Sequence, residues 1–150
     1  MIFQWSDEIA IGVEAIDAGH RRLVDIIGRF HEGADHGSIG AMRDALARLR
    51  RHAVDHFALE EELQRKAGYP KAAAHAAEHR DMLLALDALA RRLASTGAAE
   101  RAETLREETS TFLIQWLTRH VLGADLVMVP YAGRMRDAQR AAPPAGGAAG

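Results

Sequence analysis

Two pairs of histidines stand four residues apart in this chain: His52 with His56, and His75 with His79. Eight histidines placed at random in 150 residues would give roughly 0.4 such pairs, so the spacing is in excess. Four residues of helix correspond to a rotation offset of about 40° and a rise of about 6 Å, so both rings of a pair can converge on one point. His75 and His79 are therefore a candidate metal chelate, although one isolated pair could equally be two half-buried rings that hydrogen-bond locally.

Carboxylates accompany these histidines at helical spacing. In "HFALEEEL", Glu60 follows His56 by four residues and shares its face. Glu61 and Glu62 are rotated from His56 by about 140° and about 240°, toward water. We therefore expect only the first of the three glutamates to point inward.

The segment "WLTRHVLGAD" carries His120 and, five residues later, Asp125. An uninterrupted helix would turn Asp125 about 140° away from His120. Gly123 lies between them, and glycine's conformational freedom could let the chain bend there and bring the carboxylate back.

Together the inward-facing candidates comprise five imidazoles and two carboxylates: His20, His56, Glu60, His75, His79, His120 and Asp125. Burying so many ionisable groups costs stability unless something satisfies them together, and a metal centre does so. Seven ligands exceed the four of a tetrahedral zinc. They suit two octahedral ions bridged by the carboxylates, and imidazole with carboxylate suits iron, although affinity order alone would favour copper or zinc.

Helices must position these side chains, because apolar residues recur at separations of three and four and β-branched runs are absent. We expect helices near residues 17–35, 39–66, 70–95 and 99–122, with Pro70 in the first turn of the third. Short loops favour an antiparallel up-down-up-down four-helix bundle, an all-α fold preceded by an extended N-terminal arm over residues 1–16. Residues 1–137 form this single domain, and the Ala/Pro/Gly-rich residues 138–150 are expected to be a disordered tail.

Composition limits the partners and the compartment. The net charge is −2 and the 19 lysines and arginines are spread along the chain, so no basic face is available for nucleic acid. The chain has no cysteine, so any metal must be held by nitrogen and oxygen. The N-terminus lacks the features of a signal peptide, and the longest apolar stretch, residues 82–90, is shorter than the roughly 20 residues of a bilayer span. We expect a cytoplasmic protein without a membrane partner.

At these residues the sequence closely resembles the hemerythrin family, in particular its single-domain bacterial members, the bacteriohemerythrins. The resemblance runs through "WSDEIAIGVEAIDAGHRRL", "HFALEEEL", "YPKAAAHAAEH", "WLTRHVLGAD" and "VPY", over residues 5–131. It implies an oxo- or hydroxo-bridged diiron centre in which Glu60 and Asp125 bridge the ions. It also implies the distribution of the histidines: one iron is bound by His75, His79 and His120, the other by His20 and His56.

The function implied by the resemblance is reversible dioxygen binding, for storage, delivery or sensing, at the open position of the iron with two histidines. The protein would then not be an enzyme, and the sequence does not identify an oxygen-consuming partner protein. One departure from the family pattern is Gly19, where glutamine is frequent; it weakens the helix locally but removes no ligand.

Two other functions remain open at the level of sequence. The same site could reduce peroxide or nitric oxide, or oxidise iron, which would require an accessible proton donor near the open position. Alternatively, the bundle could be a structural or interaction module with adventitious metal, whose folding would be nearly indifferent to chelators.

Overall fold

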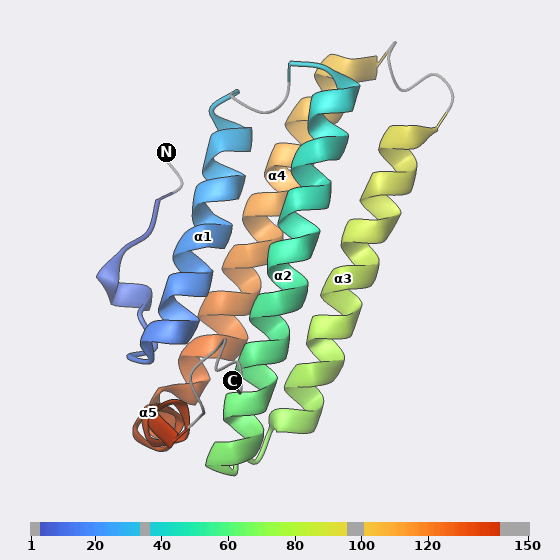
Figure 1. Cartoon of the computed structure of the whole chain (residues 1–150). Coiled ribbons are helices and arrows are strands. Elements are labelled where there is room, and N and C mark those ends of the chain that lie inside the picture. The colour runs from blue at the N-terminus through green and yellow to red at the C-terminus, as the bar shows by residue number, and fades with distance from the viewer. Residues whose placement is uncertain (1–3, 34–36, 96–100, 142–150) are drawn as a thin grey trace, which may run out of the picture.

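The chain folds as a four-helix bundle in the computed structural model, which describes residues 4–33, 37–95 and 101–141 (Figure 1). The bundle consists of α1 (Glu14–His31), α2 (Ile39–Ala67), α3 (Ala72–Ala94) and α4 (Ala102–His120). Neighbouring helices lie side by side and alternate in direction, and the described residues contain no strand. The predicted all-α, up-down-up-down architecture is confirmed.

Local signals set the ends of α2. The hydroxyl of Ser38 accepts a hydrogen bond from the backbone N–H of Ala41 at 3.0 Å and caps the first turn. Gly68 ends the helix in the left-handed conformation, with φ +69°. The third helix begins at Ala72, two residues after Pro70, so the prediction that Pro70 lies in its first turn is wrong.

The first helix is displaced toward the N-terminus relative to its predicted range, and Asp17 explains part of the shift. Asp17 is buried in the first turn of α1 and accepts hydrogen bonds from the backbone N–H groups of Ile11 and Gly12, at 2.7 and 3.0 Å. These bonds fasten the arm, which enters α1 after Val13 and includes a short 3₁₀ turn, η1 (Asp7–Ile9). The arm therefore lies against the bundle, beside α1 (Figure 1).

After α4 the backbone stays helical but changes its winding. A π-helical turn, η3 (Val121–Asp125), is followed by a 3₁₀ segment, η4 (Leu126–Tyr131), and by a fifth helix, α5 (Ala132–Ala141). The sequence did not predict α5, which lies across the end of the bundle where α2 ends (Figure 1). Residues 138–141, assigned from composition to the tail, form the end of this helix, and residues 142–150 lie outside the described residues.

One stretch is apolar enough to pass a test for membrane crossing. By length and composition alone, the helical run Ala102–Ala141 could cross a membrane, and 39% of its most apolar part is buried in the fold. Within this run Leu105, Leu113 and Leu117 are buried in the bundle core. Part of this hydropathy therefore comes from core side chains of α4. The sequence argument missed the run because it considered only uninterrupted apolar stretches.

In the described part of the chain, the buried apolar side chains form two clusters along the bundle. The larger one fills the space between α1, α2, α3 and α4 and includes Phe57 and Trp116. The smaller one joins the arm, the end of α2 and α5, and includes Leu63 and Met128. His56 and Glu60 lie on α2 at the boundary between the clusters, so the apolar clusters enclose a polar layer.

Candidate metal centre

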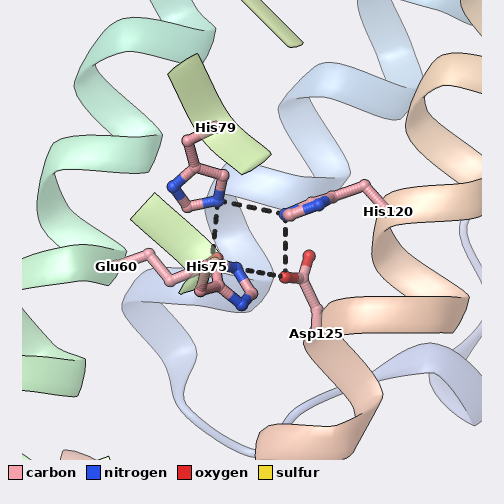
Figure 2. A group of neighbouring side chains, drawn as sticks. All are labelled: Glu60, His75, His79, His120 and Asp125. Atoms are coloured by element: carbon pink, nitrogen blue, oxygen red, sulfur yellow. Dashed lines mark hydrogen bonds and ion pairs between the residues drawn. The ribbon is translucent and has the colours of Figure 1, made fainter. Parts of the chain in front are cut away.

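All seven candidate ligands meet in this polar layer. The bundle helices supply the histidines and Glu60, and η3 supplies Asp125; none of the seven side chains is more than 6% exposed. Their ligand atoms fall into two groups, within each of which every atom lies within 4.8 Å of the others. The groups are Glu60, His75, His79, His120 and Asp125, drawn in Figure 2, and His20, His56 and Glu60.

Glu60 belongs to both groups and turns one oxygen toward each. Its Oε1 lies 2.6 Å from Nε2 of His75 and 3.4 Å from Nε2 of His79. Its Oε2 lies 3.3 Å from Nε2 of His56 and 3.7 Å from Nε2 of His20. The carboxylate is thus oriented to bridge two ions, one in each group.

Asp125 spans the two groups in the same way. Its Oδ1 lies 3.0 Å from Nε2 of both His75 and His120, and its Oδ2 lies 2.9 Å from Nε2 of His20. The carboxylates of Glu60 and Asp125, on different elements, therefore both lie between the three-histidine group and the two-histidine group.

These short contacts are for the most part not hydrogen bonds. The Nε2 atoms of His20, His56 and His75, Oε2 of Glu60 and both oxygens of Asp125 are buried without a hydrogen-bond partner among the described residues. Buried polar atoms in proteins normally have at least one hydrogen-bond partner. Atoms that approach one another without hydrogen-bond geometry, and whose lone pairs point into a shared space, fit metal ligands.

The bend that returns Asp125 to the site is made by the π turn. In a π helix the hydrogen bond runs from i to i+5, which places residues five apart, such as His120 and Asp125, one above the other. Gly123 is not among the described glycines with positive φ, and a Cβ added there would meet nothing within 4 Å. The conjecture that glycine's freedom creates the bend is wrong, because the change of winding achieves it with ordinary φ values.

Two further carboxylates orient histidines from outside the cluster. Glu61 lies 2.9 Å from Nδ1 of His79, and Glu78 lies 3.1 Å from Nδ1 of His120. Such bonds fix the ring so that the opposite nitrogen faces the metal. The prediction that Glu61 points only to water is wrong, and Glu78 was missed, although its position directly before His79 was a usable signal.

Among the residues that the structure describes, the rings of the second group have no equivalent carboxylate partners. The Nδ1 atoms of His20 and His56 have no hydrogen-bond partner among the described residues. The two groups thus differ in the number of imidazoles and in the charge behind them.

Without a cation, protons neutralise the site. Burial disfavours the charged form of His20, but its close contacts with Asp125 and Glu60 outweigh burial and raise its pKa to about 9. The same balance raises the pKa of His75 to about 10. Burial and the neighbouring Glu60 would raise the pKa of Asp125, yet contacts with His120, His20 and His75 lower it to about 2. A metal ion would take the place of the protons that these imidazoles carry.

His56 differs from His20 and His75 in its protonation. Burial lowers its pKa, and the contact with Glu60 does not compensate, so the neutral ring with a free lone pair is favoured. The ring lies directly over Gly19, where an added Cβ would be 2.0 Å from Nδ1. Gly19 therefore provides space for a candidate ligand, which is more than the local weakening of the helix that the sequence indicated.

Aromatic rings close the site toward the bundle core. Phe57 stacks on His79 with ring centroids 3.9 Å apart, and the indole of Trp116 donates a hydrogen bond to the carbonyl of Met82 at 3.0 Å. His52 lies outside the cluster, where its Nε2 accepts a hydrogen bond from Nε of Arg22 at 3.2 Å. His52 is thus partly exposed and lies in polar surroundings.

Comparisons with known proteins agree with this geometry. A family model described as "Hemerythrin HHE cation binding domain" matches residues 11–132. A bacteriohemerythrin of Stenotrophomonas maltophilia is 31% identical over 81% of this chain and 75% of its own length. A bacteriohemerythrin of Methylococcus capsulatus is 30% identical over 82% and 90%. A crystal structure titled wild-type hemerythrin superposes with a TM-score of 0.74 at 26% identity, covering 88% of this chain and 98% of that one.

Proposed function

The chain belongs to the hemerythrin family, and from this premise we propose that it binds dioxygen reversibly at a non-haem diiron centre. Family membership and the histidine–carboxylate cluster together imply an iron-binding, oxygen-related role. In the proposed centre Glu60 and Asp125 bridge the two ions. One ion is held by His75, His79 and His120, and the other by His20 and His56.

The observation that carries this proposal is the shared position of the two carboxylates. Each presents one oxygen to the group with three histidines and the other to the group with two. A single ion would not require both carboxylates to span two separate sets of imidazoles. With two ions, each bound by one oxygen of Glu60 and one of Asp125, all seven buried side chains serve as ligands.

The difference between the two groups supports a dioxygen site on one side. An ion bound by two imidazoles has one protein ligand fewer than an ion bound by three, which leaves a position for an exogenous ligand. An iron pair held by these residues would supply the two electrons that dioxygen takes up on binding and gives back on release. Five of the seven ligands are neutral imidazoles, so the chain contributes less negative charge than a carboxylate-rich site would, and this favours release over further oxidation.

Binding without turnover is supported by the surroundings of the two-histidine group. Turnover of a reduced oxygen species requires protons. In the described part of the chain, His20 and His56 have no hydrogen-bond partner at Nδ1 that could relay one, and apolar clusters enclose the layer on both sides. We therefore propose a binding protein and not an enzyme.

The test is to reduce the iron-loaded protein anaerobically, admit air, and record the visible spectrum through repeated cycles of argon and air. The proposal predicts about two irons per chain and a visible band that appears with air and disappears under argon. A colourless protein with one tightly bound zinc would refute it. Rapid irreversible oxidation with consumption of dioxygen would favour the enzymatic alternative instead.

A further inference from the structure

Gln64 is a fully buried polar residue next to the centre, and the ligand set does not use it. It lies one helical turn after Glu60 on α2 and has no exposed surface. Its amide nitrogen donates to Oε1 of Glu60 at 3.3 Å and contacts the sulfur of Met128 at 2.9 Å. Glutamine is rarely buried completely, so this position calls for a specific reason.

The stability of the fold does not provide that reason. The amide oxygen Oε1 of Gln64 is buried without a hydrogen-bond partner among the described residues, and such an unsatisfied acceptor destabilises a fold. The thioether of Met128 is only a weak acceptor for the amide nitrogen. An apolar side chain of similar volume would fill the same space without these defects.

The hydrogen bond acts on one end of the bridging carboxylate only. Oε1 of Glu60, which accepts from Gln64, is also the oxygen beside His75 and His79. Oε2, which faces His56, accepts no hydrogen bond from Gln64. The amide thus restricts rotation of the carboxylate about its last bond and makes the two bridging oxygens unequal.

We propose that Gln64 is a positioning residue that holds Glu60 in its bridging orientation, with Met128 holding Gln64 in turn. This inference rests on the proposed pair of metal ions. In that centre Gln64 keeps Oε1 directed to the three-histidine group and Oε2 to the two-histidine group before a cation arrives. The buried amide lowers the stability of the metal-free protein and strengthens the binding of the metal ions.

The experiment compares wild type with Gln64→Met, which removes the amide at nearly constant volume. Co²⁺ is titrated into each metal-free protein and followed by its visible absorption, and thermal unfolding of both metal-free proteins is followed by circular dichroism. Outer-shell partners of metal ligands typically contribute about 10–100-fold to affinity. We expect Gln64→Met to bind Co²⁺ about tenfold or more weakly, while its metal-free form unfolds at the same or a higher temperature. Gln139→Met, at an exposed position on α5, is the matched control and should change neither property.

The opposite directions of these two readouts separate positioning from packing. A fall in Co²⁺ affinity accompanied by an equal loss of metal-free stability would overturn the proposal, because packing alone would explain it. Unchanged affinity for two ions would also overturn it and leave the proposed function intact. If wild type itself does not bind a pair of ions, both proposals fail. If Gln64→Met does not fold, Met128→Leu serves instead, because it keeps Gln64 but removes the sulfur that its amide contacts. Met128→Leu is expected to weaken Co²⁺ binding by a smaller factor.

Discussion

Replacing Gly19 with alanine should remove one ion from the centre and leave the fold intact. A Cβ at this position would lie 2.0 Å from Nδ1, 2.7 Å from Cε1 and 2.9 Å from Cγ of His56. Non-bonded carbon contacts are comfortable only near 3.5–4.0 Å, so the ring must retreat by about 1.5 Å. Bonds from imidazole to a metal are about 2.0–2.1 Å long and tolerate errors of about 0.2 Å. The displacement is several times larger than that tolerance, so His56 can no longer bind.

The same substitution should not weaken the helix. Gly19 lies within α1, and alanine is favoured over glycine in a helix interior by about 1 kcal/mol. Any loss of metal in Gly19→Ala therefore cannot be attributed to a less helical α1. Gly123→Ala is the matched control, because a Cβ at that position meets nothing within 4 Å.

The assay is to reconstitute wild type, Gly19→Ala and Gly123→Ala with Fe²⁺ under anaerobic conditions, remove free metal, and measure iron per chain. Wild type and Gly123→Ala should retain about two irons, and Gly19→Ala about one, because the three-histidine group does not include His56. Circular dichroism of each variant should show the same helix content. Two irons bound with unchanged affinity in Gly19→Ala would refute the reasoning that His56 is a ligand held in its place by this glycine.

Two further predictions concern protons and the outer carboxylates. The pKa values of His20 and His75 are raised to about 9 and about 10, so both rings are protonated in the metal-free protein at pH 7 and deprotonated in the metal complex. Burial disfavours the charged form of His120, but contacts with Asp125 outweigh burial and raise its pKa as well. Apparent Co²⁺ affinity should therefore rise between pH 6.5 and 9, with at least about two protons released per chain near pH 7 in calorimetric titrations performed in different buffers; a pH-independent affinity would contradict this assignment. Glu61→Gln and Glu78→Gln remove the negative charge behind His79 and His120, and each should weaken metal binding about tenfold or more. Glu62→Gln, whose carboxylate pairs with Arg65 and Lys66 instead, should have no effect, and equal losses in all three variants would argue against a specific role.

Much of the centre could be predicted because the rotation per residue in an α-helix is fixed. His56 with Glu60, and His75 with His79, share a face whenever their segments are helical, whatever the surrounding fold. The ends of α2 are set by chemistry that is equally local, the Ser38 cap at its start and the left-handed Gly68 at its end. These positions required no knowledge of the neighbouring helices.

Residues whose role depends on a neighbouring element could not be placed in this way. Glu61 is rotated away from His56 on its own helix, and its side chain is 37% exposed, yet it reaches His79 because α3 lies beside α2. The burial of Gln64 depends on Met128, which belongs to the smaller apolar cluster built around α5. That helix is too polar to be predicted alone, and it is held in part by Arg136, whose guanidinium donates to the carbonyl of Gly12 at 2.9 Å.

The π turn combines both kinds of information. Spacing alone showed that Asp125 would miss the site in a regular helix, so the ligand set itself required a local change of winding between His120 and Asp125. Sequence reasoning assigned that change to Gly123 because glycine is the residue most often used to bend a chain. A π turn is less favourable than an α turn, and π-helical turns appear frequently at functional sites. Here the turn aligns two candidate ligands five residues apart, with Oδ1 of Asp125 3.0 Å from Nε2 of His120. The requirement of the metal centre, and not the conformational freedom of one residue, therefore explains why the fourth helix departs from regular winding at this point.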